Sequence, residues 1–194
     1  MILVTGGCRS GKSEFSEALV KGDGRGRWLY IATAKITDKE MEVRVQKHRE
    51  RRSASWDTYE ADENLLTFLA SEAVKAYDGI LLDSVTTLVT NLLFEWIGDV
   101  DWEHFQFEDV DFEAAGRWIM EQITALGRRC EALPVVFVSD EIGLGVVPET
   151  CLGRNFRDIL GSANQYLAGI CREVYFVVSG IPVKIKGKDG VGIL

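Results

Sequence analysis

Residues 6–13 of the chain read GGCRSGKS. This stretch has the form G-x-x-x-x-G-K-S/T of a phosphate-binding loop, and it follows the apolar run ILVT at residues 2–5 and precedes a helical pattern at residues 12–20. Glycines let backbone N–H groups turn towards phosphate oxygens, and the helix adds the positive end of its dipole. We expect Lys12 to reach the β- and γ-phosphates of a nucleotide and Ser13 to bind Mg²⁺.

Apolar runs that predict strands alternate along the chain with patterns that predict helices. The predicted strands are residues 2–5, 28–33, 55–60, 79–83, 134–141, 174–181 and 183–186. The predicted helices are residues 12–20, 37–52, 61–76, 86–98, 112–131 and 152–172. In the first helix, Phe15, Ala18 and Leu19 are expected to form the buried face. This alternation predicts an α/β fold with a mostly parallel sheet flanked by helices.

The composition predicts a globular protein with a single domain over residues 1–194. Of the residues, 46% are hydrophobic and 27% are charged, and the formal net charge is −8. The negative charge argues against nucleic acid as the main partner. No apolar stretch is long enough to span a membrane, and residues 1–7 are interpreted as a strand entering the loop rather than as a signal peptide. The four cysteines, Cys8, Cys130, Cys151 and Cys171, show neither CxxC pairing nor metal-ligand spacing, which favours reduced thiols in a cytoplasmic protein.

Several predicted strands end in polar residues. Besides the phosphate loop, these are ATA at residues 32–34, Asp83, and the pair Asp140 and Glu141. Ligands of parallel sheets bind beyond the carboxyl ends of the strands, so these residues are expected to share one site. Asp83 is the first choice for an acid that holds the metal, and the pair at residues 140–141 is the alternative. The competing interpretation is that each acid only caps the helix after it.

The two histidines lie in different surroundings. His104 belongs to the acidic, aromatic segment 99–113 and is expected to face solvent. His48 lies in RVQKHRERR, residues 44–52, a basic cluster in an acidic protein and therefore a local anion site. A solvated helix face is the ordinary interpretation of this cluster. The functional interpretation is nucleophilic catalysis, because a neutral imidazole attacks phosphorus near neutral pH while flanking arginines bind a triphosphate.

Six blocks, in this order, carry a resemblance to a known family. They read ILVTGG-x-RSGKS, YIATA, EMEVRVQKHRERRSASWDTYE, LLDSVTTLVTNLL, VVFVSDEIGLGVVPE and RNFRDILGSANQYLA. Over nearly its whole length the chain resembles the bifunctional adenosylcobinamide kinase/adenosylcobinamide-phosphate guanylyltransferase family of cobalamin biosynthesis. The resemblance implies a RecA-like P-loop fold, homo-oligomers with a trimer as the expected form, and two reactions. One phosphorylates adenosylcobinamide with ATP or GTP, and the other transfers GMP from GTP through a guanylylated histidine, giving adenosylcobinamide-GDP and pyrophosphate.

The resemblance also implies roles for particular residues. His48 would carry GMP, and Lys12 would act with it in catalysis. Ser13 and Asp83 are the expected Mg²⁺ ligands, and Glu60 is a further acid that could hold the metal instead of Asp83. The implied nucleotide-binding residues are Gly6, Gly7, Cys8, Arg9, Ser10, Gly11, Lys12, Ser13, Ile31, Ala32, Thr33, Arg49, Glu50, Arg51, Arg52, Glu60 and Asp83. Cys8 departs from the family, where alanine is frequent, and a small side chain there leaves the loop backbone intact. The segment 99–113 is assigned no role.

Two other functions fit the same residues. One is a small-molecule P-loop kinase with a single activity, in which His48 is a bystander, and the other is a GTP-gated binding module. The sequence has no NKxD-type guanine signature, which disfavours a GTPase switch but leaves guanine binding by other groups open. Both alternatives predict that no covalent nucleotide adduct forms. The expected partners are therefore a nucleoside triphosphate and a corrinoid, with no nucleic acid and no membrane span.

Overall fold

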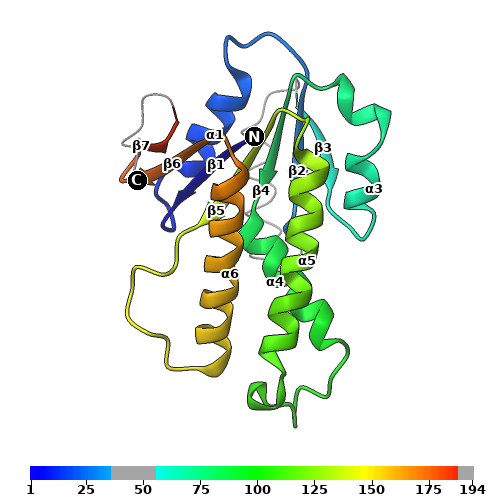
Figure 1. The fold of residues 1–194 in the computed structure, drawn as a ribbon, viewed down its shortest axis with the longest axis vertical. Coiled ribbons are helices and arrows are strands. Elements are labelled where there is room, and N and C mark those ends of the chain that lie inside the picture. The colour runs from blue at the N-terminus through cyan, green and yellow to red at the C-terminus, as the bar shows by residue number, and fades with distance from the viewer. Residues whose placement is uncertain (36–55, 188–194) are drawn as a thin grey trace.

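Seven strands form one sheet in the order β3-β2-β4-β5-β1-β6-β7, and every neighbouring pair is parallel except β6 and β7. The computed structural model describes residues 1–35 and 56–187, and Figure 1 shows its ribbon. The strands are β1 (Ile2–Gly6), β2 (Trp28–Ala32), β3 (Trp56–Glu60), β4 (Gly79–Asp83), β5 (Val135–Asp140), β6 (Glu173–Val178) and β7 (Ile181–Lys186). The helices are α1 (Lys12–Lys21), α3 (Leu65–Leu69), α4 (Val85–Ile97), α5 (Phe112–Cys130) and α6 (Cys151–Ile170), with 3-10 turns η1 (Glu72–Ala76) and η2 (Phe107–Asp109). The mostly parallel α/β sheet that the sequence predicts is confirmed.

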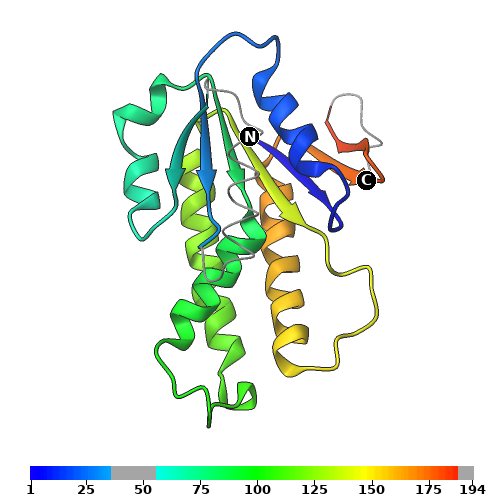
Figure 2. The ribbon, with the colours of Figure 1, turned by 180° about the vertical axis from the view of Figure 1, so that it is seen from behind.

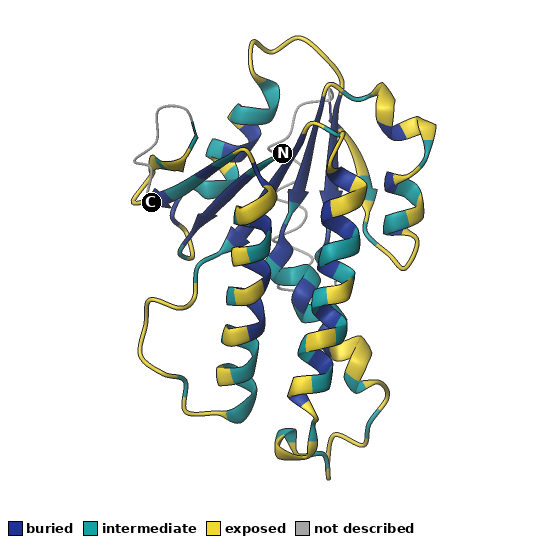
Figure 3. Ribbon diagram, in the orientation of Figure 1, coloured by how far each residue is buried: buried dark blue, intermediate teal, exposed yellow. Residues whose placement is uncertain are grey.

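Helices cover both faces of the sheet. α4, α5 and α6 lie on the face that is in front in Figure 1, and α1 lies on the opposite face, in front in Figure 2. Successive residues of a strand point to opposite faces, so Leu3 packs in the core beneath α5 and α6, whereas Val4 packs in the core beneath α1. Because both faces are buried, the central strands are apolar at nearly every position, and Figure 3 shows them buried along most of their length.

The strand order determines which strand ends meet at the phosphate loop. β1 lies between β5 and β6, and its last residue, Gly6, is level with Asp140 of β5 and Val177 of β6. β5 separates β1 from β4, which is the order expected for a RecA-like P-loop fold. The loop after β1 therefore opens at the carboxyl edge of the sheet, where ligands of parallel sheets bind.

The helix predicted over residues 61–76 is wrong in its extent. α3 has only five residues, and the extended Ser71 (φ −79°, ψ 155°) separates it from η1. Before α3, Asp62 Oδ1 accepts hydrogen bonds from the Tyr59 hydroxyl (2.7 Å) and from the Asn64 N–H (3.0 Å). These local bonds hold a turn in place of the first helical residues, because Asp and Asn side chains compete with helical backbone bonding.

The buried face of α1 differs in part from the predicted one. Phe15 and Leu19 pack against the core beneath α1, as expected, but Ala18 is exposed and Ser16 and Glu17 are buried. α1 begins directly after the phosphate loop and packs on β4 and β5. Its orientation is therefore determined by the loop as well as by the apolar periodicity, which is the only signal that the sequence pattern uses.

The three long helices agree with the predictions. The expected ranges 86–98, 112–131 and 152–172 match α4, α5 and α6 to within two residues at each end. The expected helix at residues 37–52 lies outside the described ranges. Within residues 1–35 and 56–187, no helix is both long enough and apolar enough to cross a bilayer.

The acidic segment 99–111 links α4 to α5 at the end of these helices that projects beyond the sheet, at the bottom of Figure 1. Its aromatic side chains pack on one another, with Trp102 and Phe105 ring centroids 5.3 Å apart and Phe105 and Phe107 centroids 5.0 Å apart. His104 lies in this segment with its side chain 81% exposed, and its Nδ1 is 2.8 Å from Oδ2 of Asp101. The expectation that His104 faces solvent is confirmed.

Candidate nucleotide-binding site

The phosphate loop turns sharply between β1 and α1. The Ser10 N–H donates to the Gly7 carbonyl at 3.2 Å, which closes the turn. Arg9 and Gly11 have positive φ values of 55° and 92°, and glycine enters this region without the steric cost that other residues meet. These dihedral angles give the loop the compact shape that directs backbone N–H groups inward.

The β6–β7 hairpin supports the loop from one side. The Gly180 N–H, in the hairpin turn, donates to the Ser10 carbonyl at 2.8 Å. A Cβ at Gly11 would lie 3.2 Å from the Gly180 Cα, and a Cβ at Gly6 would lie 2.5 Å from the Val177 carbonyl oxygen. The backbone of the hairpin thus leaves no space for a side chain at position 6.

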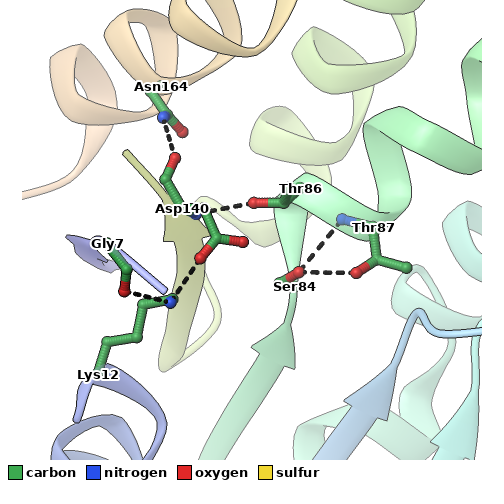
Figure 4. Close-up of polar contacts among 7 residues, drawn as sticks. All are labelled: Gly7, Lys12, Ser84, Thr86, Thr87, Asp140 and Asn164. Carbon is green, nitrogen blue, oxygen red and sulfur yellow. Dashed lines mark hydrogen bonds and ion pairs between the residues drawn. The ribbon is translucent and has the colours of Figure 1, made fainter. Parts of the chain in front are cut away.

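The Lys12 side chain extends from the start of α1 to the end of β5 (Figure 4). Its Nζ lies 2.5 Å from Oδ1 of Asp140 and donates to the Gly7 carbonyl at 3.1 Å. Asp140 is fixed by its backbone, since its N–H donates to Thr86 Oγ1 (2.7 Å) and its carbonyl accepts from Asn164 Nδ2 (3.0 Å). The Lys12 side chain is only 11% exposed. An anion bound in the loop would compete with these two oxygens for its ammonium group.

Asp83 ends β4, on the far side of β5 from the phosphate loop. The Tyr30 hydroxyl donates to its Oδ2 at 2.9 Å, and its carbonyl accepts from the Thr33 N–H at 3.2 Å. Thr33 Oγ1 donates to the Ser84 carbonyl (2.8 Å) and accepts from the Ser84 N–H (2.7 Å). These bonds join the ends of β2 and β4 and hold the Asp83 carboxylate at the carboxyl edge.

The strand register brings further predicted residues to the same level. Ala32 pairs with Asp83 on one side and with Glu60, which is exposed, on the other. The side chains of Ile31 and Thr33 have no exposed surface. Ile31 belongs to the core, so only its backbone is available to a ligand, and Thr33 serves to join the two strand ends.

The remaining predicted residues divide into two groups. Cys8 and Arg9 are exposed residues of the loop, and Ser13 lies half-buried in the first turn of α1. The other group consists of His48, Arg49, Glu50, Arg51 and Arg52, which lie outside the described residues. The expected nucleophile and its basic neighbours therefore stay predictions.

The described residues fit a magnesium ion that is bound together with a nucleotide. Within residues 1–35 and 56–187 there is no cluster of three or more His, Cys, Asp or Glu side chains that would hold a metal on its own. Mg²⁺ in nucleotide sites needs only one or two carboxylates, with phosphate and water oxygens completing the octahedron. Asp83 and Asp140 supply such carboxylates, and the buried hydroxyls of Ser10 and Ser139 find no hydrogen-bond partner among the described residues. The fit therefore rests on these carboxylates, because Ser10 and Ser139 are 8% and 0% exposed and a ligand has little or no access to their hydroxyls.

Sequence patterns did not single out the residues that orient the two acids. Tyr30 is 4% exposed and looks like any aromatic residue of a buried strand, yet its hydroxyl contacts Asp83. Thr86 and Asn164 lie on α4 and α6, and they bond to the backbone of Asp140. Polar residues at buried helix positions are a usable signal for such contacts, since buried polar groups need partners.

Three relatives align with almost the whole chain. The bifunctional adenosylcobalamin biosynthesis protein CobU of Salmonella typhimurium (strain LT2) is 48% identical over 188 residues, covering 96% of this chain and 99% of that protein. The protein of the same name from Escherichia coli (strain K12) is 46% identical with the same coverage. The bifunctional adenosylcobalamin biosynthesis protein CobP of Pseudomonas aeruginosa (strain PAO1) is 38% identical and covers 96% of this chain and 97% of its own.

A family match covers the same region. Residues 2–185 match the family described as cobinamide kinase / cobinamide phosphate guanyltransferase. The matched range includes the phosphate loop, Asp83, Asp140 and all but the last residue of the β6–β7 hairpin that supports the loop. Together with identities of 38–48% over nearly complete chains, this match shows that the chain belongs to the cobinamide kinase / cobinamide phosphate guanyltransferase family.

Proposed function

We propose that this chain is a bifunctional transferase of cobalamin biosynthesis, which phosphorylates adenosylcobinamide and then transfers GMP from GTP to the resulting phosphate. The family and the printed names of the relatives support both activities. The observation that carries the proposal is the position of Lys12, whose ammonium group lies between a complete phosphate loop and Asp140 at the carboxyl edge. This arrangement serves phosphoryl transfer, in which catalysis consists mainly of positioning and charge stabilisation.

In the kinase reaction, the loop backbone and Lys12 bind the triphosphate of ATP or GTP. Arrival of the phosphates would draw the ammonium group from Asp140 to the β- and γ-phosphate oxygens, where negative charge develops during transfer. Ser13 and Asp83 are the residues that would hold Mg²⁺, with Asp140 as the alternative acid. The ion would neutralise charge on the bridging and terminal oxygens. The Tyr30 hydroxyl keeps the Asp83 carboxylate oriented for this role.

In the guanylyl transfer, His48 is the proposed nucleophile. Its neutral imidazole nitrogen forms a bond to the α-phosphorus of GTP as the bond to the bridging oxygen breaks, and pyrophosphate leaves with the electron pair. The phosphate of adenosylcobinamide phosphate then attacks the same phosphorus, and the histidine is released. Dividing the reaction into two displacements allows pyrophosphate to depart before the corrinoid phosphate attacks. Arg49, Arg51 and Arg52 are proposed to bind the phosphates beside His48, because guanidinium groups match phosphate geometry.

The proposal also covers the domain organisation, the oligomeric state and the cellular location of the protein. We infer that residues 1–194 act as one nucleotide-binding domain and that the chain works in the cytoplasm as a homo-oligomer, with a trimer as the expected form. The proposed partners are small molecules, a nucleoside triphosphate and a corrinoid. The chain's net charge of −8 is unfavourable for nucleic acid.

The direct test is the product of the complete reaction. The purified chain is incubated with adenosylcobinamide, Mg²⁺ and GTP, and the corrinoids are separated and identified by mass. The proposal predicts adenosylcobinamide phosphate first and adenosylcobinamide-GDP later, with pyrophosphate released in step with the second product. A kinase with a single activity would produce adenosylcobinamide phosphate and no adenosylcobinamide-GDP. A binding module would leave adenosylcobinamide unchanged.

A further inference from the structure

A cavity of about 870 Å³ lies between α3, α4 and α5. Leucines from all three helices line it, among them Leu66, Leu92 and Leu126. Its uncharged polar lining consists of Thr87, Thr90, Asn91 and Gln122. Binding sites for small molecules are typically concave and mostly apolar, with a few convergent polar groups that fix orientation. The cavity has both this composition and a volume in the range of such sites.

Hydrogen bonds connect the α4 wall of the cavity to the carboxyl edge of the sheet. Thr87 Oγ1, in the lining, lies 2.9 Å from the hydroxyl of Ser84, the residue after Asp83 (Figure 4). Asn91 Nδ2, also in the lining, donates to the Thr33 carbonyl at the end of β2 (2.7 Å). The first turn of α4 thus forms part of the cavity wall and contacts Ser84, the residue after Asp83, which is the carboxylate proposed to bind Mg²⁺.

The same turn also reaches the residue that pairs with Lys12. Thr86, next to Thr87 of the lining, accepts the N–H of Asp140 at 2.7 Å, and Asp140 pairs with Lys12 at 2.5 Å. The phosphate loop and the cavity therefore lie on the two sides of the start of α4. A kinase needs its phosphate donor and acceptor held close to one another, and the first turn of α4 connects the two sites.

The charges of the lining disfavour a phosphate in the cavity. Among the described lining residues, Asp62, Glu63 and Glu95 carry carboxylates and Lys35 carries the one ammonium group. A triphosphate would be repelled by this excess of negative charge. An uncharged ligand with apolar surface and amide groups would be accepted, because Gln122 offers a side-chain amide and the leucines offer apolar contacts.

We propose that this cavity binds the acceptor of the kinase reaction, the uncharged, amide-linked alcohol arm of the corrinoid together with adjoining apolar surface of its ring. The inference rests on the proposed kinase function and adds the position of its second substrate. In the transfer, the acceptor hydroxyl oxygen bonds to the γ-phosphorus as the bond to the bridging oxygen breaks. The nucleoside diphosphate leaves with the electron pair, and the hydroxyl proton is released.

The test fills the cavity without touching the phosphate loop. Leu66→Trp places a larger side chain in the lining, and Thr67→Trp, on the neighbouring exposed position of α3, is the matched control. Adenosylcobinamide affinity is measured by equilibrium dialysis, its KM in the kinase reaction by initial rates, and GTP affinity by titration. Leu66→Trp is expected to weaken adenosylcobinamide binding and to raise its KM by about tenfold or more, the discrimination typical of a side-chain-sized steric change. The GTP affinity of Leu66→Trp is expected to equal that of the wild type, and Thr67→Trp is expected to change the affinity for neither substrate.

A second variant covers the case in which Leu66→Trp disturbs folding. Gln122→Leu removes the amide while keeping a similar volume, and it is expected to raise the adenosylcobinamide KM about threefold or more without changing that of GTP. Unchanged adenosylcobinamide affinity in folded variants, an equal loss of GTP affinity, or a wild-type chain that binds no adenosylcobinamide would overturn the inference. If the wild type binds adenosylcobinamide but phosphorylates none of it, the proposed kinase function fails, and the dialysis comparison still decides whether this cavity holds the corrinoid.

Discussion

The ammonium nitrogen of Lys12 lies 2.5 Å from Oδ1 of Asp140, so an ion pair joins the start of α1 to the end of β5 at the carboxyl edge of the sheet. The pair gives the lysine a defined direction in the absence of nucleotide. Because the Asp140 side chain is 29% exposed, water and phosphate can both reach the pair, and a triphosphate can displace the carboxylate at modest cost. Lys12 is therefore oriented in advance for the charge that develops during transfer.

Replacing Lys12 tests this role. Lys12→Ala is expected to lower kcat/KM of the kinase reaction about 100- to 1,000-fold, the usual loss when one group that stabilises transition-state charge is removed. The free energy of unfolding should fall by no more than about 1–3 kcal/mol, because the partly exposed Asp140 carboxylate can bind water once the lysine is removed. Lys75→Ala is the control, because Lys75 forms an exposed ion pair with Glu72 (2.6 Å) away from the site. Turnover of Lys12→Ala near that of the wild type would remove the phosphate loop as the kinase site.

A second prediction concerns the close packing of the loop on the β6–β7 hairpin. In Gly6→Ala the new methyl group would lie 2.5 Å from the Val177 carbonyl oxygen and 2.7 Å from Ser10 Oγ. The backbone must shift to relieve these contacts, which costs about 1–3 kcal/mol of unfolding free energy. Urea denaturation measures the loss. Gly7→Ala is the matched control because its methyl group would have no neighbour within 4 Å, and equal stabilities of the two variants would contradict the packing described here.

A third prediction follows from the contact between Tyr30 and Asp83. Tyr30→Phe removes the hydroxyl that donates to Oδ2 at 2.9 Å, so the carboxylate loses its fixed orientation. The Mg²⁺ concentration for half-maximal kinase activity is expected to rise about tenfold or more, as is typical when a partner that orients a metal ligand is lost. Tyr166→Phe, which removes a hydroxyl that bonds to the Thr124 carbonyl (3.3 Å), should leave this concentration unchanged. An unaltered Mg²⁺ dependence of Tyr30→Phe would argue that Asp83 does not hold the metal.

The cysteines give a prediction about pH and reactivity. Burial raises the pKa of Cys130 to about 12 and that of Cys171 to about 11, so at neutral pH almost none of either thiol is the reactive thiolate. Cys8 is exposed on the phosphate loop. A thiol reagent at pH 7.5 should therefore modify the exposed Cys8 in the native chain, and Cys130 and Cys171 only after denaturation. Saturating GTP should slow modification of Cys8. Mass spectrometry of the peptides measures the extent of modification at Cys8, Cys130 and Cys171.

Much of the fold is determined by signals that lie close together in the sequence. β1, the loop and α1 form one continuous sequence motif. The strand Gly79–Asp83 has the predicted bounds, because a short apolar run between a glycine and an acidic residue is typical of a buried strand. The helix predicted at residues 61–76 was wrong since Asp62 and Asn64 form a turn whose competition with the helix is not visible in the apolar spacing. Local side-chain bonding decided this element.

The site was predictable only in part for a different reason. The ends of parallel strands meet at one edge, so the loop, Asp83 and Asp140 were expected together, and they lie there. Which acid faces Lys12 depends on strand order, which places β5 next to β1 and β4 one strand farther away. The contacts of Tyr30 and Gly180 depend on pairing across 53 and 170 residues of sequence, respectively, and no local pattern contains that information.

The most direct measurement uses GTP labelled at the α-phosphate, incubated with the chain and Mg²⁺ without corrinoid. The proposed mechanism predicts a protein-bound label that survives alkali and is lost in acid, as a phosphoramidate behaves. The label should be absent in His48→Ala, although this variant still binds GTP, and it should be released as adenosylcobinamide-GDP when adenosylcobinamide phosphate is added to the labelled wild type. Label that persists in His48→Ala, or a wild type that never becomes labelled, would contradict guanylyl transfer through this histidine.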